Sequence, residues 1–439
     1  MRSAVCLVTP AFGEGIGKTA EGRKEFKVAL ESFIAGLLGQ DLPVRIRAYD
    51  GTDVGPRDAR TTITLRSRDA LIRMATASGE LGFARAYIAG DIEIDGNIYD
   101  VLSLKDALPV VKLTLGQVKA LVQTVGLRNL RKIPPPPEEH RRQGRFHTRR
   151  SDSSSIQHHY DVSNEFFRLI LGSSLTYSCA VFERPDESLE QAQQRKYELI
   201  CQKLGLHPGM RLLDIGCGWG GMVRHAAEHH GVRSVGVTIS EKQADFAEKQ
   251  VADAGLTDLV EIRTQDYRDV DDGPYDAISS IGMFEHVGMR RLSEYFDTVS
   301  RLLAPGGRLL NHAISRRRTE HRSLIRRTGF LDRYVFPDGE LHEVGSVITA
   351  LQNAGLEVRH MENLREHYAL TLRRWVSNLE ENWEAAIAEV GEGRAKIWQL
   401  YMAGSALMFE ANDIHVDQVL AIKTPRDGDS HLPLRPTWN

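Results

Sequence analysis

Apolar positions follow two alternating periodicities in the second half of the chain. Five short apolar runs, each bounded by Gly or polar residues, predict strands. They lie at residues 211–216, 234–239, 259–264, 275–282 and 307–315. Helical spacing separates most of these runs, near residues 219–230, 241–254 and 289–303. Strands and helices in alternation predict an α/β fold with a mostly parallel sheet.

The two ends of the chain have different patterns. After the alternating region, helical spacing predicts late helices at 343–354, 366–390 and 394–411, and a final strand at 416–423. Before it, residues 61–67 alternate like a strand and residues 68–79 have helical spacing. The first 127 residues carry no catalytic constellation. They predict a small α+β domain that binds or positions something.

A proline- and arginine-rich segment, residues 128–155, divides the chain. Its four consecutive prolines favour extended geometry. We therefore expect a domain at 1–127, this linker, a catalytic domain at 156–424 and a tail at 425–439. The basic charges of the linker fit either a solvated connection or an arm that lies on anionic phospholipid. A second basic cluster at 315–327 favours the arm.

Composition narrows the class of protein. The chain has 439 residues, 41% hydrophobic and 26% charged, with a net charge of −3, so it is no polycation that would attract nucleic acid. Four cysteines form no C-x-x-C pair, and His158, His159, His229 and His230 lack a partner pattern, so we expect no metal site. No run reaches the roughly 18 apolar residues of a membrane span. We expect a cytoplasmic protein whose membrane contact is peripheral.

A glycine loop follows the first strand of the alternating region. In "LLDIGCGWGG", Asp214 ends the strand, and Gly216, Gly218 and Gly220 allow the backbone to approach a ligand closely. The second strand ends without the acidic residue that holds the ribose of NAD, which argues against a dinucleotide. The spacing resembles motif I of the S-adenosylmethionine-dependent methyltransferases. The segment with Gln265 and Asp266 resembles the part that contacts adenine in those enzymes.

The fourth strand ends in a mixed polar and apolar patch. In "ISSIGMFEHVG", Glu285 and His286 follow an apolar strand and stand beside Met283 and Phe284. Such a patch at the carboxyl end of a strand is typical of the floor of a pocket. Methyltransferases that act on nucleic-acid amino groups carry Asn or Asp before Pro-Pro-Tyr at this position, so the chemistry here should differ.

Five motifs in order resemble one family. The segments at 159–182, 214–221, 235–243, 265–269 and 282–288 are together similar to the cyclopropane fatty acid synthase family. The resemblance implies a Rossmann-like class I methyltransferase fold with a seven-stranded sheet. The N-terminal region also resembles the small domain of the bacterial phospholipid enzymes. Those relatives imply a homodimer that acts on phospholipid acyl chains at the inner face of the membrane.

The resemblance also implies a reaction and its residues. A cis double bond attacks the methyl group of S-adenosylmethionine, and bound bicarbonate removes a proton from the carbocation to close a cyclopropane. The bicarbonate cradle carries over to Cys179, Glu285, His312, Ile314 and Tyr368. The residues expected to contact or cover S-adenosylmethionine are Tyr160, Tyr177, Ser178, Asp214, Gly216, Gly218, Gly220, Thr238, Gln243, Gln265 and Asp266.

Several alternatives remain open from the sequence. A hydride shift after methyl transfer would give a methylene branch, which a partner reductase would convert to a methyl branch. A methyltransferase acting on a small molecule or nucleic acid is a second alternative, and a non-catalytic lipid-binding protein is a third. Cys179 and His312 could also be ordinary core residues. Tyr368 and Trp375 are seven residues apart on a predicted helix, which core packing explains equally well.

Overall fold

A computed structural model describes residue 31 and residues 43–77, 80–104, 133–140, 162–317, 329–336 and 340–438. Contacts between Cα atoms divide the chain into two compact units, Met1–Pro136 and Pro137–Asn439. Tyr160, most of the 128–155 segment and most of the second basic cluster lie outside the described residues.

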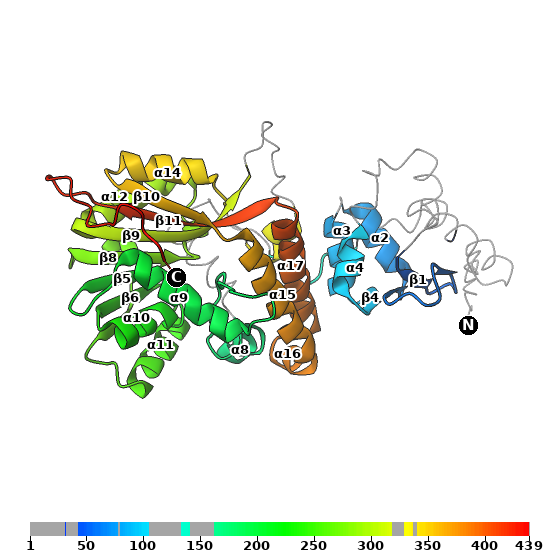
Figure 1. Ribbon diagram of the computed structural model, residues 1–439. Coiled ribbons are helices and arrows are strands. Elements are labelled where there is room, and N and C mark those ends of the chain that lie inside the picture. Colours follow the sequence, from blue (N-terminus) through cyan, green and yellow to red (C-terminus); the bar gives the residue numbers. More distant parts are fainter. Residues whose placement is uncertain are drawn as a thin grey trace, which may run out of the picture. The chain divides into compact units, whose positions relative to one another are not determined.

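The first unit is a small α+β domain (Figure 1). Its four-stranded sheet has the order β2-β1-β3-β4, with β1 parallel to β3 and the other pairs antiparallel. The described elements are β1 (Arg45–Ala48), β2 (Asp53–Val54), β3 (Thr62–Leu65), α2 (Arg68–Thr76), α3 (Glu80–Ile88), β4 (Ile92–Asp95) and α4 (Ile98–Leu102). Ser67 caps α2 by accepting a hydrogen bond from the Asp69 N–H. The strand and helix predicted at 61–79 are confirmed as β3 and α2.

A seven-stranded sheet forms the centre of the second unit. Its order is β10-β11-β9-β8-β5-β6-β7, and only β11 runs antiparallel to its neighbours. The strands are β5 (Arg211–Ile215), β6 (Arg233–Thr238), β7 (Val260–Thr264), β8 (Tyr275–Ile281), β9 (Leu303–Arg316), β10 (Glu357–Asn363) and β11 (Ile414–Ile422). The sequence predicted every strand except β10. This edge strand carries Glu357, Arg359, His360 and Glu362, so it lacks an apolar run.

Helices cover both faces of this sheet. Helices α9 (Leu189–Leu204), α10 (Gly221–His230) and α11 (Glu241–Asp253) share apolar clusters with one face. Helices α12 (Leu292–Leu302) and α14 (Val344–Asn353) bury Phe296 and Leu351 against the other face. This arrangement is the α/β fold with a mostly parallel sheet that the alternation of strands and helices predicted, and its seven strands match the sheet that the family resemblance implied.

A helical layer stands beside the sheet. Figure 1 shows α15 (Arg365–Glu381), α16 (Trp383–Val390) and α17 (Glu392–Glu410) gathered together with α8 (Asn164–Leu171). The sequence predicted one helix over 366–390, but Asn382 ends α15 and starts α16. The Asn382 side chain donates to the Asn378 carbonyl, which accounts for the break. None of the described helices is long and apolar enough to cross a membrane.

Candidate active site

A cavity of about 160 Å³ opens where β5, β6 and β8 end. The carboxyl ends of parallel strands are the usual ligand-binding edge of such a sheet. The lining includes most of the residues that the sequence assigned to the cosubstrate: Tyr177, Ser178, Asp214, Gly216, Gly218, Thr238, Gln243, Gln265 and Asp266. Gly220 lies outside the lining. Its small size instead lets α10 pack on α11, because a Cβ there would lie 3.0 Å from that of Ala247.

The glycine loop is shaped by close packing. Gly216 adopts φ +79°, and a Cβ at this position would lie 2.8 Å from the Cβ of Met283. Only glycine combines this conformation with so little space. The N–H groups of Gly216 and Cys217 both donate to the Val237 carbonyl, which ties the loop to β6. The floor of the cavity therefore has a fixed backbone. Cys217 packs in the apolar cluster between α10 and α11.

Opposite charges are buried beside the loop. Asp214 accepts a hydrogen bond of 2.6 Å from the Ser279 hydroxyl, and burial raises the pKa of its carboxyl to about 6. Lys196 on α9 donates to the Ser178 hydroxyl at 2.9 Å, and burial lowers the pKa of its ammonium to about 7. Each group favours the charged form of the other. Lys196 carries no signal in the sequence, because a lysine on a helix is normally solvated.

Side-chain hydrogen bonds orient the amides on the far side of the cavity. The Thr238 hydroxyl donates to Gln243 Oε1 at 3.0 Å, and Gln265 Nε2 donates to the Asp269 carbonyl at 2.8 Å. Arg268, which also lines the cavity, makes two hydrogen bonds of 2.8 and 2.5 Å with the Asp266 carboxylate. In the segment expected to contact adenine, Asp266 therefore forms an ion pair with Arg268 in the lining of the cavity.

Glu285 lies in a short 3-10 helix, η3 (Phe284–His286), directly after β8. Its Oε1 accepts a hydrogen bond of 2.7 Å from the Ile314 N–H, whereas its buried Oε2 has no partner among the described residues. Burial raises the pKa of the carboxyl to about 7. The carboxylate that follows an apolar strand in the sequence is therefore explained, because Glu285 reaches across to β9. His286 lines the cosubstrate cavity instead.

His312 lies two residues before Ile314, on the same face of β9. Its Nδ1 is 3.2 Å from Gln418 Nε2, and Gln418 Oε1 accepts a hydrogen bond of 2.6 Å from the Lys203 ammonium. An ammonium only donates, so Gln418 must present its NH₂ group to His312. Nδ1 is then an acceptor, and Nε2 carries the hydrogen. Burial lowers the pKa of His312 to about 3, so the ring is neutral.

This Lys203–Gln418–His312 relay lies in the interior of the second unit. The three side chains come from α9, β11 and β9, and all three residues are fully or almost fully buried. Lys203 also pairs with the Glu362 carboxylate. His312 Nε2 is buried and has no partner among the described residues. The relay therefore presents one oriented N–H donor at His312 Nε2.

The Cys179 thiol and the backbone N–H of Tyr368 both contact the carbonyl oxygen of Leu364. The Cys179 thiol is 3.8 Å from the Leu364 carbonyl oxygen, and the Tyr368 N–H donates to that same oxygen at 3.1 Å. Burial raises the pKa of the Cys179 thiol, so it stays protonated. The Leu364 N–H donates to Val416, the residue paired with Ile314 across β11 and β9. The five predicted cradle residues thus belong to segments that are joined through β9 and β11.

Aromatic rings connect the cosubstrate cavity to these residues. The ring of Tyr177 lies 5.3 Å from that of Trp375, which in turn lies 6.0 Å from the ring of Tyr368. Trp398 packs 5.8 Å from Tyr177, and the Tyr177 hydroxyl donates to Tyr401 at 3.0 Å. Trp398 and Tyr401 do not stand out in the sequence, because α17 buries residues on nearly all of its sides.

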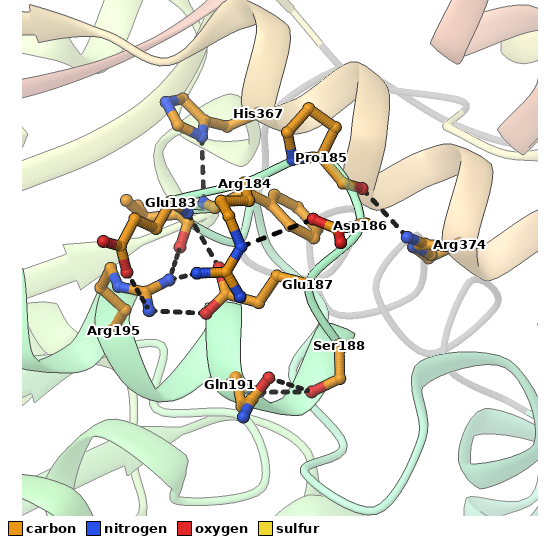
Figure 2. A network of polar contacts seen from close by, with 12 residues as sticks. Glu183, Arg184, Pro185, Asp186, Glu187, Ser188, Gln191, Arg195, His367 and Arg374 are labelled. Carbon is orange, nitrogen blue, oxygen red and sulfur yellow. Dashed lines mark hydrogen bonds and ion pairs between the residues drawn. The ribbon is translucent and has the colours of Figure 1, made fainter.

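A polar network holds the segment that follows Tyr177, Ser178 and Cys179. Figure 2 shows Arg195 on α9 bound to Glu187 through two contacts of 2.5 Å and to Glu183 at 3.2 Å. This bonding lowers the pKa of the Glu187 carboxyl to about 2. The Phe182 N–H donates to His367 on α15 at 3.1 Å. The network therefore anchors the segment between α9 and α15.

The fold and the cavity define a class I methyltransferase. Residues 147–419 match the family model described as mycolic acid cyclopropane synthetase, so the chain belongs to this family. A protein named as a probable fatty acid methyltransferase of Mycobacterium tuberculosis is 46% identical over 95% of this chain and 99% of its own length. The tuberculostearic acid methyltransferase UfaA1 of the same species is 34% identical over 87% of this chain and 88% of its own.

Solved structures agree with the family assignment. The cyclopropane synthase MmaA2 from M. tuberculosis superposes with a TM-score of 0.59 at 35% identity, covering 62% of this chain and 98% of its own. The mycolic acid cyclopropane synthase CmaA1, in a complex with SAH and CTAB, gives a TM-score of 0.58 at 36% identity over 62% of this chain and 98% of its own. The predicted family and fold class are both confirmed.

Proposed function

We propose that this protein transfers the methyl group of S-adenosylmethionine to the cis double bond of an unsaturated phospholipid acyl chain and produces a cyclopropane fatty acid. The alkene carbon forms a bond to the methyl carbon as the sulfur–methyl bond breaks, leaving S-adenosylhomocysteine and a carbocation. A proton then leaves the new methyl group and the ring closes. The names of the relatives support a fatty acid substrate, and the SAH complex of CmaA1 supports the cosubstrate.

The observation that carries the proposal is a pair of buried polar atoms that lack partners among the described residues: Glu285 Oε2 and His312 Nε2. One is an acceptor and the other a donor, and orphaned buried groups of this kind are costly. Bicarbonate offers one O–H donor and anionic oxygen acceptors, so the two atoms fit it. When bound there, bicarbonate would supply the base that removes the proton. The Cys179 thiol and the Ile314 backbone would complete the site.

The chain itself has three tasks in this reaction. The aromatic rings of Tyr177, Trp375 and Trp398 would stabilise the carbocation through their faces and exclude water. Glu285 and His312 would orient the base. The glycine loop and Asp214 would hold the methionine portion of the cosubstrate, so that its methyl group points away from the loop.

A methylene-branched product, reduced later by a partner enzyme, is the second candidate. The 34% identity to a tuberculostearic acid methyltransferase favours it. Both products need the same methyl transfer and differ only in whether a hydride moves before the proton leaves. Both products can be tested by expressing this chain in a bacterium that makes unsaturated lipids but no cyclopropane lipids. Mass spectrometry of the lipids from this bacterium then identifies the product.

We expect acyl chains heavier by one CH₂ group in cells that express the wild-type chain. Ozone cleaves a methylene branch but not a cyclopropane ring, so a product that resists ozone identifies the ring. Cells expressing Glu285→Gln serve as the control and should lack the new lipid. An unchanged lipid profile with the wild-type chain would contradict both candidates, and labelling of RNA instead would establish the nucleic-acid alternative.

The first unit would position the lipid. The mycolic acid synthases cover about 60% of this chain, whereas the fatty acid methyltransferases cover most of it, including this unit. We therefore propose that the first unit and the basic linker hold phospholipid at the inner membrane surface, with the enzyme acting as a homodimer.

Asp214→Asn should weaken S-adenosylmethionine binding about tenfold, because a hydrogen bond to a charged group contributes roughly 1.5–3 kcal/mol. The carboxyl binds a cation only when ionised, and its pKa is about 6. Wild-type affinity should therefore fall as the pH drops below this value, while the variant loses this dependence. Calorimetric titration from pH 5 to 8 measures it. Asp245→Asn, at an exposed position of α11, is the control, and equal pH profiles for Asp214→Asn and wild type would refute the assignment.

A further inference from the structure

A group of metal-ligating side chains lies between α9 and α10. Cys201 comes from α9, and His225 and His230 come from α10. One ligand atom of each, the thiol sulfur and a ring nitrogen of each histidine, lies within 4.8 Å of the other two. The lining residues of the cosubstrate cavity do not include these three residues. The cluster is therefore a separate feature of the fold.

A carboxylate holds the two imidazole rings. Glu198 lies one turn before Cys201, and its Oε2 is 3.0 Å from His230 Nε2 and 3.4 Å from His225 Nε2. Gln202 Nε2 donates to the other oxygen of Glu198 at 3.0 Å. A metal-binding histidine usually donates its other ring nitrogen to a carboxylate, so Glu198 at Nε2 of each ring would leave Nδ1 to bind a metal. The rings thus have the support that a metal site requires.

The surroundings favour a closed site. Cys201 is fully buried among apolar side chains, including Leu204 and Ala226. The side chains of His225 and His230 are 11% and 18% exposed. A thiolate with two imidazoles is a donor set that suits Zn²⁺, whereas Mg²⁺ and Ca²⁺ require oxygen ligands. The partly exposed rings of His225 and His230 leave a path for the ion to enter.

We propose that Cys201, His225 and His230 bind one Zn²⁺ ion, with the Glu198 carboxylate orienting the two rings. The ion would fasten α9 to α10. Lys196 and Tyr197 of α9 and Gly221 of α10 line the cosubstrate cavity, so the ion would stabilise two of its walls. The site is structural and independent of the methyl-transfer proposal.

This proposal departs from the expectation of no metal site. The sequence carries no C-x-x-C pair, and the two histidines are five residues apart on one helix, which is not a repeat that places both on one face. Their convergence on Cys201 depends on how the end of α10 packs against α9. Only the tertiary structure brings the three ligand atoms together.

Metal content of the full chain, purified without a histidine tag, tests the proposal. The protein is stripped with a chelator, given excess zinc, passed through a desalting column and measured by elemental mass spectrometry. We expect the wild type to retain one equivalent, and Cys201→Ser and His230→Gln to lose it. His207→Gln is the matched control, because its exposed ring lies outside the cluster. This control should retain the ion.

Cobalt substitution gives a second readout that needs no variant. Co²⁺ bound through a thiolate in a tetrahedral site produces an intense charge-transfer band, which we expect for the wild-type chain and not for Cys201→Ser. A wild type without retained zinc or without the cobalt band overturns the proposal. Zinc retained equally by Cys201→Ser and His230→Gln also overturns it. If circular dichroism shows that a variant is unfolded, the cobalt spectrum of the wild type alone decides whether the site exists.

Discussion

Glu285→Gln is expected to lower the rate of methyl transfer to unsaturated lipid about 10²–10⁴-fold, the range typical of groups that assist proton transfer. Glutamine can still accept the hydrogen bond from the Ile314 N–H at its Oε1, so the fold around the site should persist. The change acts on Oε2, the atom that lacks a partner, by replacing an acceptor with an NH₂ donor. Initial rates with labelled S-adenosylmethionine and phospholipid vesicles measure the effect.

The pH profile separates this role from a structural one. Glu285 accepts a hydrogen bond at Oε2 only when ionised, and its pKa is about 7. Wild-type activity should therefore rise as the pH increases through this value, and the residual activity of Glu285→Gln should not. Cosubstrate affinity should be the same in both. Glu248→Gln, at an exposed site on α11, is the control. A Glu285→Gln rate close to wild type would refute the assignment of this carboxylate.

Periodicity in the sequence was sufficient to predict most strands of the seven-stranded sheet. Buried parallel strands such as β5 and β8 are continuous apolar runs, and the helices between them keep an apolar face, so local pattern and tertiary position agree. Strand β10 was not predicted, because its local pattern does not resemble that of a buried strand. At the sheet edge it alternates between exposed and half-buried positions, and its residues are mostly polar. The break at Asn382 depends on one side-chain hydrogen bond, which periodicity does not reveal.

The candidate site was only partly predictable. Motifs located the glycine loop and Glu285, because these residues follow directly after predicted strands. The cradle residues His312 and Tyr368 came from family resemblance alone. Lys196, Lys203 and Gln418 were not found at all, since buried polar residues on apolar elements carry no local signal. Their roles depend on the register between β9 and β11, which places Gln418 opposite His312.

Gln418 offers the sharpest test of the relay. Gln418→Glu preserves the size of the side chain and its contact with Lys203 but replaces the NH₂ donor with an acceptor. His312 must then protonate Nδ1 to satisfy the new carboxylate, and Nε2 changes from a donor to an acceptor. The group that would hold the anionic base is lost, although no residue has been removed from the cradle.

We expect Gln418→Glu to lower kcat about 10²–10³-fold, since the wrong histidine tautomer costs a catalytic triad up to about 10⁴-fold. The affinity for S-adenosylmethionine should change little, because Gln418 does not line that cavity. Nitrogen chemical shifts of labelled His312 report the tautomer directly, and should show the hydrogen on Nε2 in wild type and on Nδ1 in the variant. Gln352→Glu, at an exposed position of α14, is the matched control. If the tautomer of His312 is reversed in Gln418→Glu but the rate is not lowered, His312 is not a donor to the base. If the tautomer is the same in the variant as in the wild type, the proposed relay is wrong.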